Sequence, residues 1–425
     1  MTTPTGTGER VPYEEYLAGI LAATGPLPAE DVGLGDPLAA AGLVTAAPVR
    51  SRLPAPVFTN SAMDGFAVRA ADLVAAAAGG EVGAADGSTV RLDVSADLPA
   101  GVPAPPWRPG TAVRIMTGAP LPSGPDGPDT VVPVEFTDQP LMRAPLPARV
   151  RIPADWPAGR NVRARGSDVP AGAEILAAGT RLDGAALAAL AAVGVGSVRV
   201  HPRVRVAIIV TGDELAATGA DLAPGQVPDS NGILLRATLS DFGADVRRHH
   251  TCSDSPEAFG ALIDDAAADV DLVITTGGAS VGAHDVARQV LTTRGVRFAA
   301  VAIQPAKPQG FGIVRGVPVL ALPGNPGAVH ASLHALVRPV LARLGGVRLP
   351  APLRLPVARG WTARPGLRQF VPVTIGPEGI SPVIPGGVAA HRVSSMAHAD
   401  GLASVPPGMA QVRTGDILSV LVTRA

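Results

Sequence analysis

Carboxylates stand directly after apolar runs that are typical of buried strands. The run Val204–Val210 is followed by Thr211-Gly212-Asp213-Glu214, which puts two acids at the carboxyl end of a strand. Asp254 and Asp285 are further acids close to neighbouring strand ends. Mg²⁺ binds carboxylate, phosphate and water oxygens together. These acids are therefore candidate ligands of a divalent cation, provided that a phosphate site lies beside them.

Two turns rich in glycine and proline follow the next strands. After Asp271–Thr276 comes Gly277-Gly278-Ala279-Ser280-Val281-Gly282, where backbone N–H groups can converge on a phosphate. After Val317–Leu322 comes Pro323-Gly324-Asn325-Pro326, which begins a long helix and is a second possible anion site. Each feature alone has a simpler explanation, because glycines form ordinary turns and acids cap helices. Their combination favours a phosphate pocket.

Alternating strands and helices must position these turns. Further helices are expected over Asn231–Phe242, Ser255–Ala268, His284–Thr293 and Gly327–Leu344, and further strands over Ala244–His249 and Arg297–Ile303. This alternation predicts a parallel sheet with helices on both faces. Ligands of such sheets bind beyond the carboxyl ends of the strands. We therefore expect one pocket, edged by Glu214, Asp285 and Asp254.

The regions on either side of this α/β segment have other patterns. Helices are expected over Pro12–Ala23 and Gly179–Val193, and a strand over Ser197–His201. Between Pro54 and Val162 lie short β-type runs separated by glycine and proline: Val57–Phe58, Phe66–Val68, Ala112–Met116, Val131–Phe136 and Arg149–Ile152. After Gly346 the hydrophobic period changes to two, which predicts a small all-β module.

Composition excludes several classes of protein. The net charge is -1 and charged residues make up 17% of the 425 residues, so a nucleic-acid-binding protein with a basic surface is not expected. No apolar run reaches the roughly 18 residues of a membrane span. Cys252 is the single cysteine, which rules out an intrachain disulfide and favours a reducing cytoplasm. Lys307 is the single lysine.

At its motifs the sequence resembles the molybdopterin molybdotransferases, the MoeA and gephyrin E-domain family. The matching stretches run in the family's order and cover nearly the whole chain: Asn60–Val68, Ile115–Pro120, Arg165–Asp168, Thr211–Leu215, Asp229–Asn231, Thr276–Gly282 with Asp285, Leu322–Pro326 and Ser394–Ser395. The resemblance implies insertion of molybdenum into adenylylated molybdopterin. Molybdate and the adenylylated pterin are the substrates, Mg²⁺ is the cofactor, and AMP and molybdenum cofactor are released.

The resemblance also implies a multidomain architecture of α/β and β parts. We expect an elongated discontinuous domain over 10–50 and 163–203, a β-rich inserted domain over 51–162, a parallel-sheet molybdopterin-binding domain over 204–347 and a β-barrel-like domain over 348–425. It further implies a homodimer whose active cleft lies between the central domain of one subunit and the β domains of the other. The molybdopterin adenylyltransferase is a candidate partner, and no nucleic acid or membrane is expected.

Residue roles carry over with the motifs. Gly277, Gly278, Ser280 and Gly282 are expected to cradle phosphate and pterin. Further expected cofactor-binding residues, without individual roles, are Asp229, Ser230, Asn231, Gly324 and Asn325. Glu214 and Asp285 are candidate Mg²⁺ ligands, followed by Asp254. Ser394 and Ser395 would line the molybdate side with Pro323 and Pro326. The expected catalytic set is Asp64, Thr117, Asp168, Glu214, Asp285 and Lys307.

One stretch departs from the family pattern. Where the family commonly has Lys-Pro-Gly-Lys-Pro, this chain has Gln304-Pro305-Ala306-Lys307-Pro308, and a basic residue often found four positions earlier is Ala300. Two positive charges are thus absent from a site that handles anions. This leaves open a catalytically weakened paralogue that binds molybdopterin or acts as a scaffold. A molybdopterin adenylyltransferase is another alternative, although the β domains and Asn60–Val68 argue against it.

Overall fold

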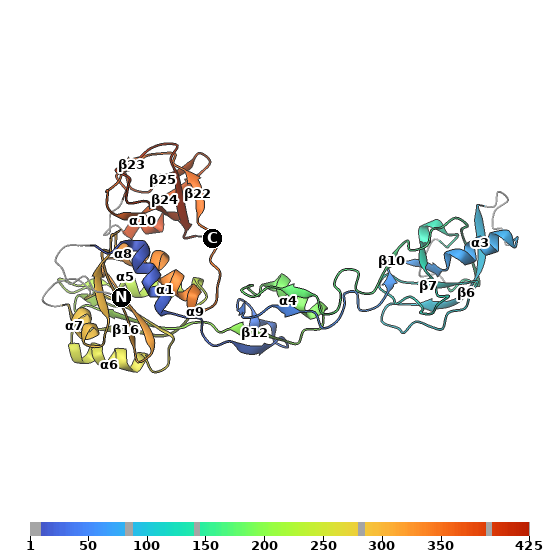
Figure 1. The fold of residues 1–425 in the computed structure, drawn as a ribbon, viewed down its shortest axis with the longest axis horizontal. Helices are drawn as coiled ribbons and strands as arrows, with labels where there is room; N and C mark the ends of the chain where they lie inside the picture. Colours follow the sequence, from blue (N-terminus) through green and yellow to red (C-terminus); the bar gives the residue numbers. More distant parts are fainter. Residues whose placement is uncertain (1–9, 81–87, 140–144, 279–284, 388–392, 425) are drawn as a thin grey trace.

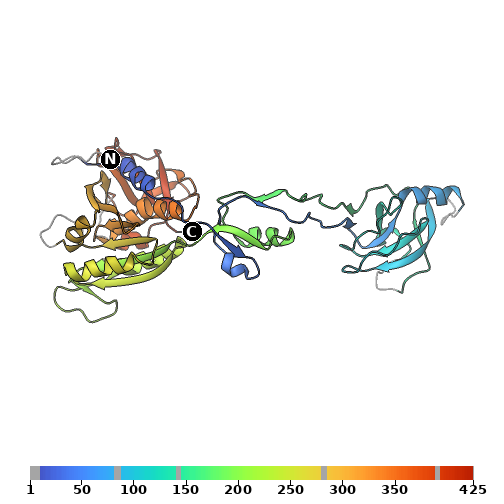
Figure 2. The same ribbon diagram turned by 60° about the horizontal axis from the view of Figure 1, so that its bottom comes forward.

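The computed structural model describes residues 10–80, 88–139, 145–278, 285–387 and 393–424. Figure 1 shows an elongated molecule, in which an α/β unit and a C-terminal β unit lie together at one end and a separate β unit lies at the other. Figure 2 shows the same separation from a second direction. Among the described residues, no helix is long and apolar enough to cross a membrane.

The α/β unit is built on a six-stranded sheet with the order β16-β13-β17-β21-β20-β18. Its strands are β13 (Arg205–Thr211), β16 (Asp245–Cys252), β17 (Leu272–Thr276), β18 (Arg297–Ala300), β20 (Pro308–Val314) and β21 (Val317–Leu322). The first four strands in this order are parallel, as predicted. β20 and β18 extend the sheet in the antiparallel sense. β20 was not predicted, because Gly310 and Gly312 interrupt its apolar pattern.

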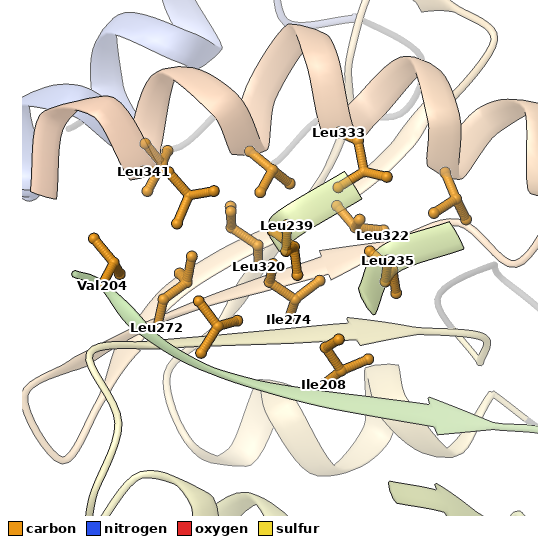
Figure 3. Close-up of a cluster of buried hydrophobic side chains, with 14 of the residues drawn as sticks. Val204, Ile208, Leu235, Leu239, Leu272, Ile274, Leu320, Leu322, Leu333 and Leu341 are labelled. Atoms are coloured by element: carbon orange, nitrogen blue, oxygen red, sulfur yellow. The ribbon is translucent and has the colours of Figure 1, made fainter. Parts of the chain in front are cut away.

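Helices cover both faces of this sheet. They are α5 (Ser230–Asp241), α6 (Pro256–Ala266) and α7 (Val286–Thr293), with the long helix that follows β21. Alternate residues of β13 point to opposite faces, so Ile208 packs with Leu235 and Leu333 while Ile209 packs with Phe259. Figure 3 shows the first of these clusters, with leucines of α5 and the long helix above the strands.

The long helix contains a π-helical turn for a local reason. It runs as α8 (Pro326–Ser332), the π-helical turn Leu333–Val337 and α9 (Arg338–Leu344). Pro339 has no N–H, so an α-helix here would leave the Ala335 carbonyl without its donor. The Tyr13 hydroxyl donates to that carbonyl at 2.8 Å. Helix α1 (Tyr13–Ala23) is thereby joined to the α/β unit, although 322 residues separate the two partners.

The C-terminal β unit receives one strand from the α/β segment. Its sheet has the order β19-β24-β26-β28-β22, with β25 paired to β24. The elements are β19 (Ile303–Gln304), β22 (Leu353–Pro356), β23 (Trp361–Thr362), β24 (Arg368–Gly376), β25 (Gly379–Pro382), α10 (Val393–Ala397), β26 (Gly401–Val405), β27 (Gln411–Val412) and β28 (Ile417–Val422). The single strand expected over Arg297–Ile303 was wrong, because the chain leaves the first sheet after Ala300 and joins the second at Ile303.

The distal β unit lies at the far end of the molecule (Figure 1). Its sheet has the order β8-β5-β7-β6-β9. The elements are β4 (Asn60–Ser61), β5 (Gly65–Val68), α3 (Ala70–Ala78), β6 (Thr89–Leu98), β7 (Thr111–Ile115), β8 (Thr130–Pro133), the 3₁₀ turn Val134–Phe136, β9 (Arg149–Pro153) and β10 (Val162–Arg163). The strand expected at Val57–Phe58 was wrong, since these residues form bends. Helix α3 and β6 were not predicted.

Short elements join the two ends. They are β1 (Glu30–Gly33), α2 (Pro37–Ala40), β2 (Val44–Thr45), β3 (Val49–Arg50), β11 (Glu174–Leu176), α4 (Gly184–Ala192) and β12 (Ser197–His201). The two passages of the chain pair with each other, since β1 and β2 flank β12 and β3 pairs with β11. The distal β unit is therefore connected to the rest of the molecule by two segments of the polypeptide rather than one.

Candidate active site

A cavity of about 660 Å³ opens at the carboxyl ends of β13, β17 and β21. It is lined by Thr211, Gly212, Glu214, Asp254, Gly277, Gly278, Asp285, Gln304, Pro305, Ala306, Lys307, Pro308, Pro323, Gly324, Asn325 and Ala328. The structure thus brings together Glu214, Asp254 and Asp285 with both glycine-containing turns and Lys307. The cavity has a strand-end wall, formed by the lining residues that follow β13, β16, β17 and β21, and a second wall formed by Gln304–Pro308.

The strand-end wall is made of closely packed backbone. Gly277 has φ 94°, and a Cβ there would lie 2.0 Å from the Thr211 carbonyl oxygen. Gly324 sits against Gly277, with its own Cβ position 3.6 Å from the Gly277 Cα. Gly278 also has positive φ, at 54°. Only glycine fits at position 277, because a side chain there would collide with the Thr211 carbonyl, and main-chain groups are therefore part of this wall beside the acids.

Two side chains hold the turn Pro323–Pro326 in one orientation. Thr276 Oγ1 donates to the Pro323 carbonyl at 2.8 Å, and Asn231 Nδ2 donates to the Gly324 carbonyl at 2.7 Å. Because N–H and C=O point in opposite directions across a trans peptide, the N–H groups of Gly324 and Asn325 point away from these two side chains. The turn can therefore offer two successive N–H donors to an anion.

Glu214, Asp254 and Asp285 all line the cavity. The Glu214 carboxylate folds back over Gly212, where a Cβ would lie 2.6 Å from Glu214 Oε2. Asp254 Oδ1 accepts a hydrogen bond of 2.6 Å from Thr211 Oγ1. Within the described part of the chain, no three His, Cys, Asp or Glu side chains are grouped closely enough to hold a metal by themselves. Oxygen donors of this kind fit Mg²⁺, which commonly takes one or two carboxylates and completes its shell with substrate phosphate and water.

The second wall is held from behind by buried polar side chains. Gln309 is buried, and its Nε2 donates to the Ala306 carbonyl at 3.0 Å and to Ser332 Oγ at 2.9 Å. Ala306 has φ 84°, a conformation that favours glycine. Lys307, the next residue, is exposed on the cavity side. This wall therefore carries the chain's single ammonium on a constrained segment.

Cys252 lies close to Asp254 and Asp213 without being a plausible nucleophile. Burial raises the pKa of its thiol, and the nearby Asp254 and Asp213 raise it further, while a hydrogen bond with Thr211 opposes them. The thiol form is therefore favoured at neutral pH.

The predicted residues on α5 have different roles. Asp229 is buried as the N-cap of α5, where its Oδ1 accepts from the Gly232 N–H at 2.8 Å, and it does not line the cavity as described. Ser230 is exposed at the first position of the helix. Asn231 acts indirectly, through the Gly324 carbonyl.

Other predicted residues do not line this cavity. Asp64 Oδ1 accepts from the Thr117 N–H at 2.7 Å, so these two are neighbours, but they belong to the distal β unit. Asp168 is exposed in the segment after β10. Ser394 and Ser395 lie on α10, which contacts α8. Pro326 begins α8. None of these residues is among the described ones that line the cavity.

Ser280 and Gly282 lie outside the described residues, so the predicted cradle is seen only at Gly277 and Gly278. Two residues that shape the second wall were missed by sequence reasoning, Gln309 and Gln369. Each is a buried glutamine inside a strand, and no spacing in the sequence connects either one to the residues it holds.

Comparisons with known proteins agree along the whole length of the chain. Residues 11–194 match the MoeA N-terminal region (domain I and II), residues 207–343 a probable molybdopterin binding domain, and residues 354–423 the MoeA C-terminal region (domain IV). Molybdopterin molybdenumtransferase 2 of Mycobacterium tuberculosis is 38% identical over 393 residues, covering 90% of this chain and 92% of that protein. Molybdopterin molybdenumtransferase of a Nostoc species is 38% identical over 338 residues, covering 78% and 71%.

Solved structures extend this agreement to the fold. A molybdopterin biosynthesis MoeA protein from Pyrococcus horikoshii matches with a TM-score of 0.81 at 28% identity, covering 98% of this chain and all of that one. A second such structure matches with a TM-score of 0.77 at 22% identity. The multidomain α/β and β architecture is thus a MoeA-like fold. By its sequence relatives and its structure, the chain belongs to the molybdopterin molybdenumtransferase family.

Proposed function

We propose that this protein inserts molybdenum into molybdopterin, with adenylylated molybdopterin and molybdate as substrates and Mg²⁺ as cofactor, and that AMP is released. The observation that carries the proposal is the cavity at the strand ends, which is lined by three carboxylates, two glycine-containing turns and the single lysine. A pyrophosphate and an oxyanion both need donors and positive charge. The names of the family members support the transfer of molybdenum to molybdopterin.

The residues of the cavity divide this work by their chemistry. Glu214 and Asp285, and Asp254 after them, would hold Mg²⁺, which when bound neutralises phosphate charge and polarises the pyrophosphate link. The N–H groups of Gly277, Gly278, Gly324 and Asn325 would donate to phosphate oxygens. The Lys307 ammonium supplies counter-charge from the opposite wall.

We also propose that the working form is a homodimer in which each active cleft combines two subunits. Asp64 and Thr117 are neighbours in the distal β unit, which lies at the opposite end of the molecule from the α/β unit (Figures 1 and 2). They can serve a cavity only if it belongs to another subunit. On this arrangement Asp64, Thr117 and Asp168 complete the partner's cleft, while Ser394, Ser395, Pro323 and Pro326 line the molybdate side. We propose as well the division into four domains that is stated above. A cytoplasmic location is proposed because the single cysteine fits a reducing compartment.

Mixing two impaired variants tests the shared cleft. Asp64→Ala and Glu214→Ala should each retain only about 1% of the activity, but a mixed dimer contains one cleft with both residues intact. After unfolding and refolding together in equal amounts, half of the dimers are mixed, so about a quarter of the unaltered activity should return. Inactivity of the mixture, with mixed dimers confirmed by differently tagged chains, would contradict a shared cleft.

A turnover assay separates the proposed activity from its alternatives. With adenylylated molybdopterin, Mg²⁺ and molybdate, the protein should release AMP, and omission of molybdate should lower that release. ATP should stay intact when it is incubated with the protein and molybdopterin. ATP consumption would instead indicate a molybdopterin adenylyltransferase, an enzyme we otherwise propose as a partner because it makes the substrate.

One observation favours a second candidate function, a catalytically silent molybdopterin-binding or scaffold protein. Gln304 lines the cavity where a cation would assist anion binding, and Ala300 ends β18 opposite Pro308. Both positions are uncharged. Binding of molybdopterin without any release of AMP from the adenylylated form would support the silent protein and would contradict the proposed enzyme.

A further inference from the structure

Gln304 sits where the two large sheets of the molecule meet. It is the last residue of β19, which pairs in parallel with Arg368 and Gln369 of β24 in the C-terminal sheet, and it also lines the cavity of the α/β unit. Gln369 is buried, with 4% of its surface exposed, and does not line that cavity as described. The C-terminal β unit therefore reaches the cavity through the contact between two glutamine side chains.

The hydrogen bonds around Gln369 determine which way its amide faces. The backbone N–H of Arg364 donates to Gln369 Oε1 at 2.9 Å. A backbone N–H can only donate, so its partner must be the amide oxygen, and the Nε2 end of Gln369 is left to face Gln304. Gln369 Nε2 donates to Gln304 Oε1 at 2.7 Å. The orientation of one amide thus dictates that of the other.

Because the amide oxygen of Gln304 accepts from Gln369, its amide nitrogen, Nε2, points away from Gln369. We infer that Gln369 is a positioning residue, which holds Gln304 so that its Nε2 donates to an oxygen of an anionic group in the cavity, either a phosphoryl group or a tetrahedral oxyanion. The inference rests on the proposed function. On this inference the uncharged Gln304 donates a hydrogen bond to the bound anion from the same wall that carries the Lys307 ammonium.

An amide needs such orientation, whereas an ammonium does not. A free glutamine side chain can turn either its oxygen or its nitrogen toward a ligand, and an oxygen facing an anion repels it. A lysine ammonium carries three equivalent donors and binds whichever way it rotates. The effect of removing Gln369 should therefore depend on which residue stands at position 304.

This dependence gives the test. Binding of inorganic pyrophosphate and of molybdate, each alone with Mg²⁺, is measured by titration calorimetry on the full-length protein. Gln369→Met is made both in the unaltered background and together with Gln304→Lys. Gln304→Met is made in the unaltered background.

Losing a hydrogen bond to an ionised group typically costs on the order of a factor of ten in affinity, so we expect about tenfold weaker binding for Gln304→Met. Loss of orientation alone should cost less, so we expect about threefold for Gln369→Met. In the Gln304→Lys background, Gln369→Met should change nothing.

The outcomes are distinguishable. An equal loss from Gln369→Met in both backgrounds would show that Gln369 only supports the fold, and would overturn the inference. Gln304→Met tests the inference even if the Gln369 variant misfolds, because it leaves the contact between Arg364 and Gln369 in place. Unchanged affinity of the Gln304→Met variant for both anions would also overturn the inference. An effect on pyrophosphate alone assigns the donor to the phosphoryl group, and an effect on molybdate alone assigns it to the oxyanion. If the unaltered protein binds neither anion, the proposed function fails together with the inference.

Discussion

The two walls of the cavity both hold anion-binding groups in fixed positions, but they do so by different structural means. The strand-end wall is built where parallel strands stop, and Gly277 and Gly278 let backbone approach backbone closely. The second wall, Gln304–Pro308, places a non-glycine residue, Ala306, at φ 84° and is tied down by buried glutamines. The first wall needs only its own sheet. The second needs a contact between two sheets whose partners are 65 residues apart.

This difference has a consequence for function. The strand-end wall carries the acids and the N–H groups, so it should determine whether the metal and phosphate are bound at all. The second wall carries one ammonium and one oriented amide, so it should adjust anion affinity over a smaller range. The predictions below test this division, beginning with the largest expected effect.

Gly277→Ala should be the most damaging single change. The added Cβ would lie 2.0 Å from the Thr211 carbonyl oxygen, and the backbone would keep its φ of 94°. A clash with backbone in a buried sheet combined with this conformation should lower the free energy of unfolding by about 4 kcal/mol. Urea denaturation measures the change. Gly316→Ala is the matched control, since Gly316 has φ 84° with nothing within 4 Å of its Cβ position, and it should cost only about 1 kcal/mol. Equal costs would show that the close approach of β13 and β17 is not essential.

Glu214→Ala and Asp285→Ala should each lower the rate of AMP release about 100-fold, equivalent to about 2.7 kcal/mol, while leaving the fold intact. Both carboxylates line the strand-end wall, and the proposed Mg²⁺ would lose a ligand. The measurement is turnover as a function of Mg²⁺ concentration. Glu378→Ala, in the exposed turn between β24 and β25, is the control and should be silent. An unchanged Mg²⁺ dependence in both cavity variants would remove the metal assignment.

The same contrast explains what could be predicted from the sequence. The four parallel strands and their helices were predicted because each is a continuous apolar or periodic run, and the meeting of Glu214, Asp254 and Asp285 followed from the rule that ligands bind at carboxyl ends of strands. The exchange of sheets between Ala300 and Ile303 was missed, because Arg297–Ile303 has one uninterrupted strand pattern. Gln369 was missed for a related reason, since only long-range pairing brings it to Gln304.

Lys307→Arg should lower kcat/KM for AMP release about tenfold. The ammonium of Lys307 is a compact charge on an exposed part of the second wall, and a planar guanidinium would have to fit beside Pro305 and Pro308 in the same cavity. Steady-state kinetics at two ionic strengths measure the loss. The control is Arg297→Lys, an exposed position in β18, which should have no effect. If Lys307→Arg is as active as the unaltered protein, the single lysine of the chain is only a feature of its arginine-rich composition.

Ala306→Gly should have the smallest effect, and it should stabilise the protein. The positive φ of Ala306 stores about 2 kcal/mol of backbone strain. Glycine would relieve that strain, but it would lose about 0.8 kcal/mol of methyl burial and about 0.7 kcal/mol of backbone entropy, so a net gain of about 0.5 kcal/mol is expected. Urea denaturation is the measurement, and Ala299→Gly in β18, where φ is not positive, should instead destabilise by about 1 kcal/mol. If both variants destabilise equally, the second wall is not strained at Ala306. A gain without any change in anion affinity would show that Gln369 and Gln309, rather than the residue at 306, keep this wall in place.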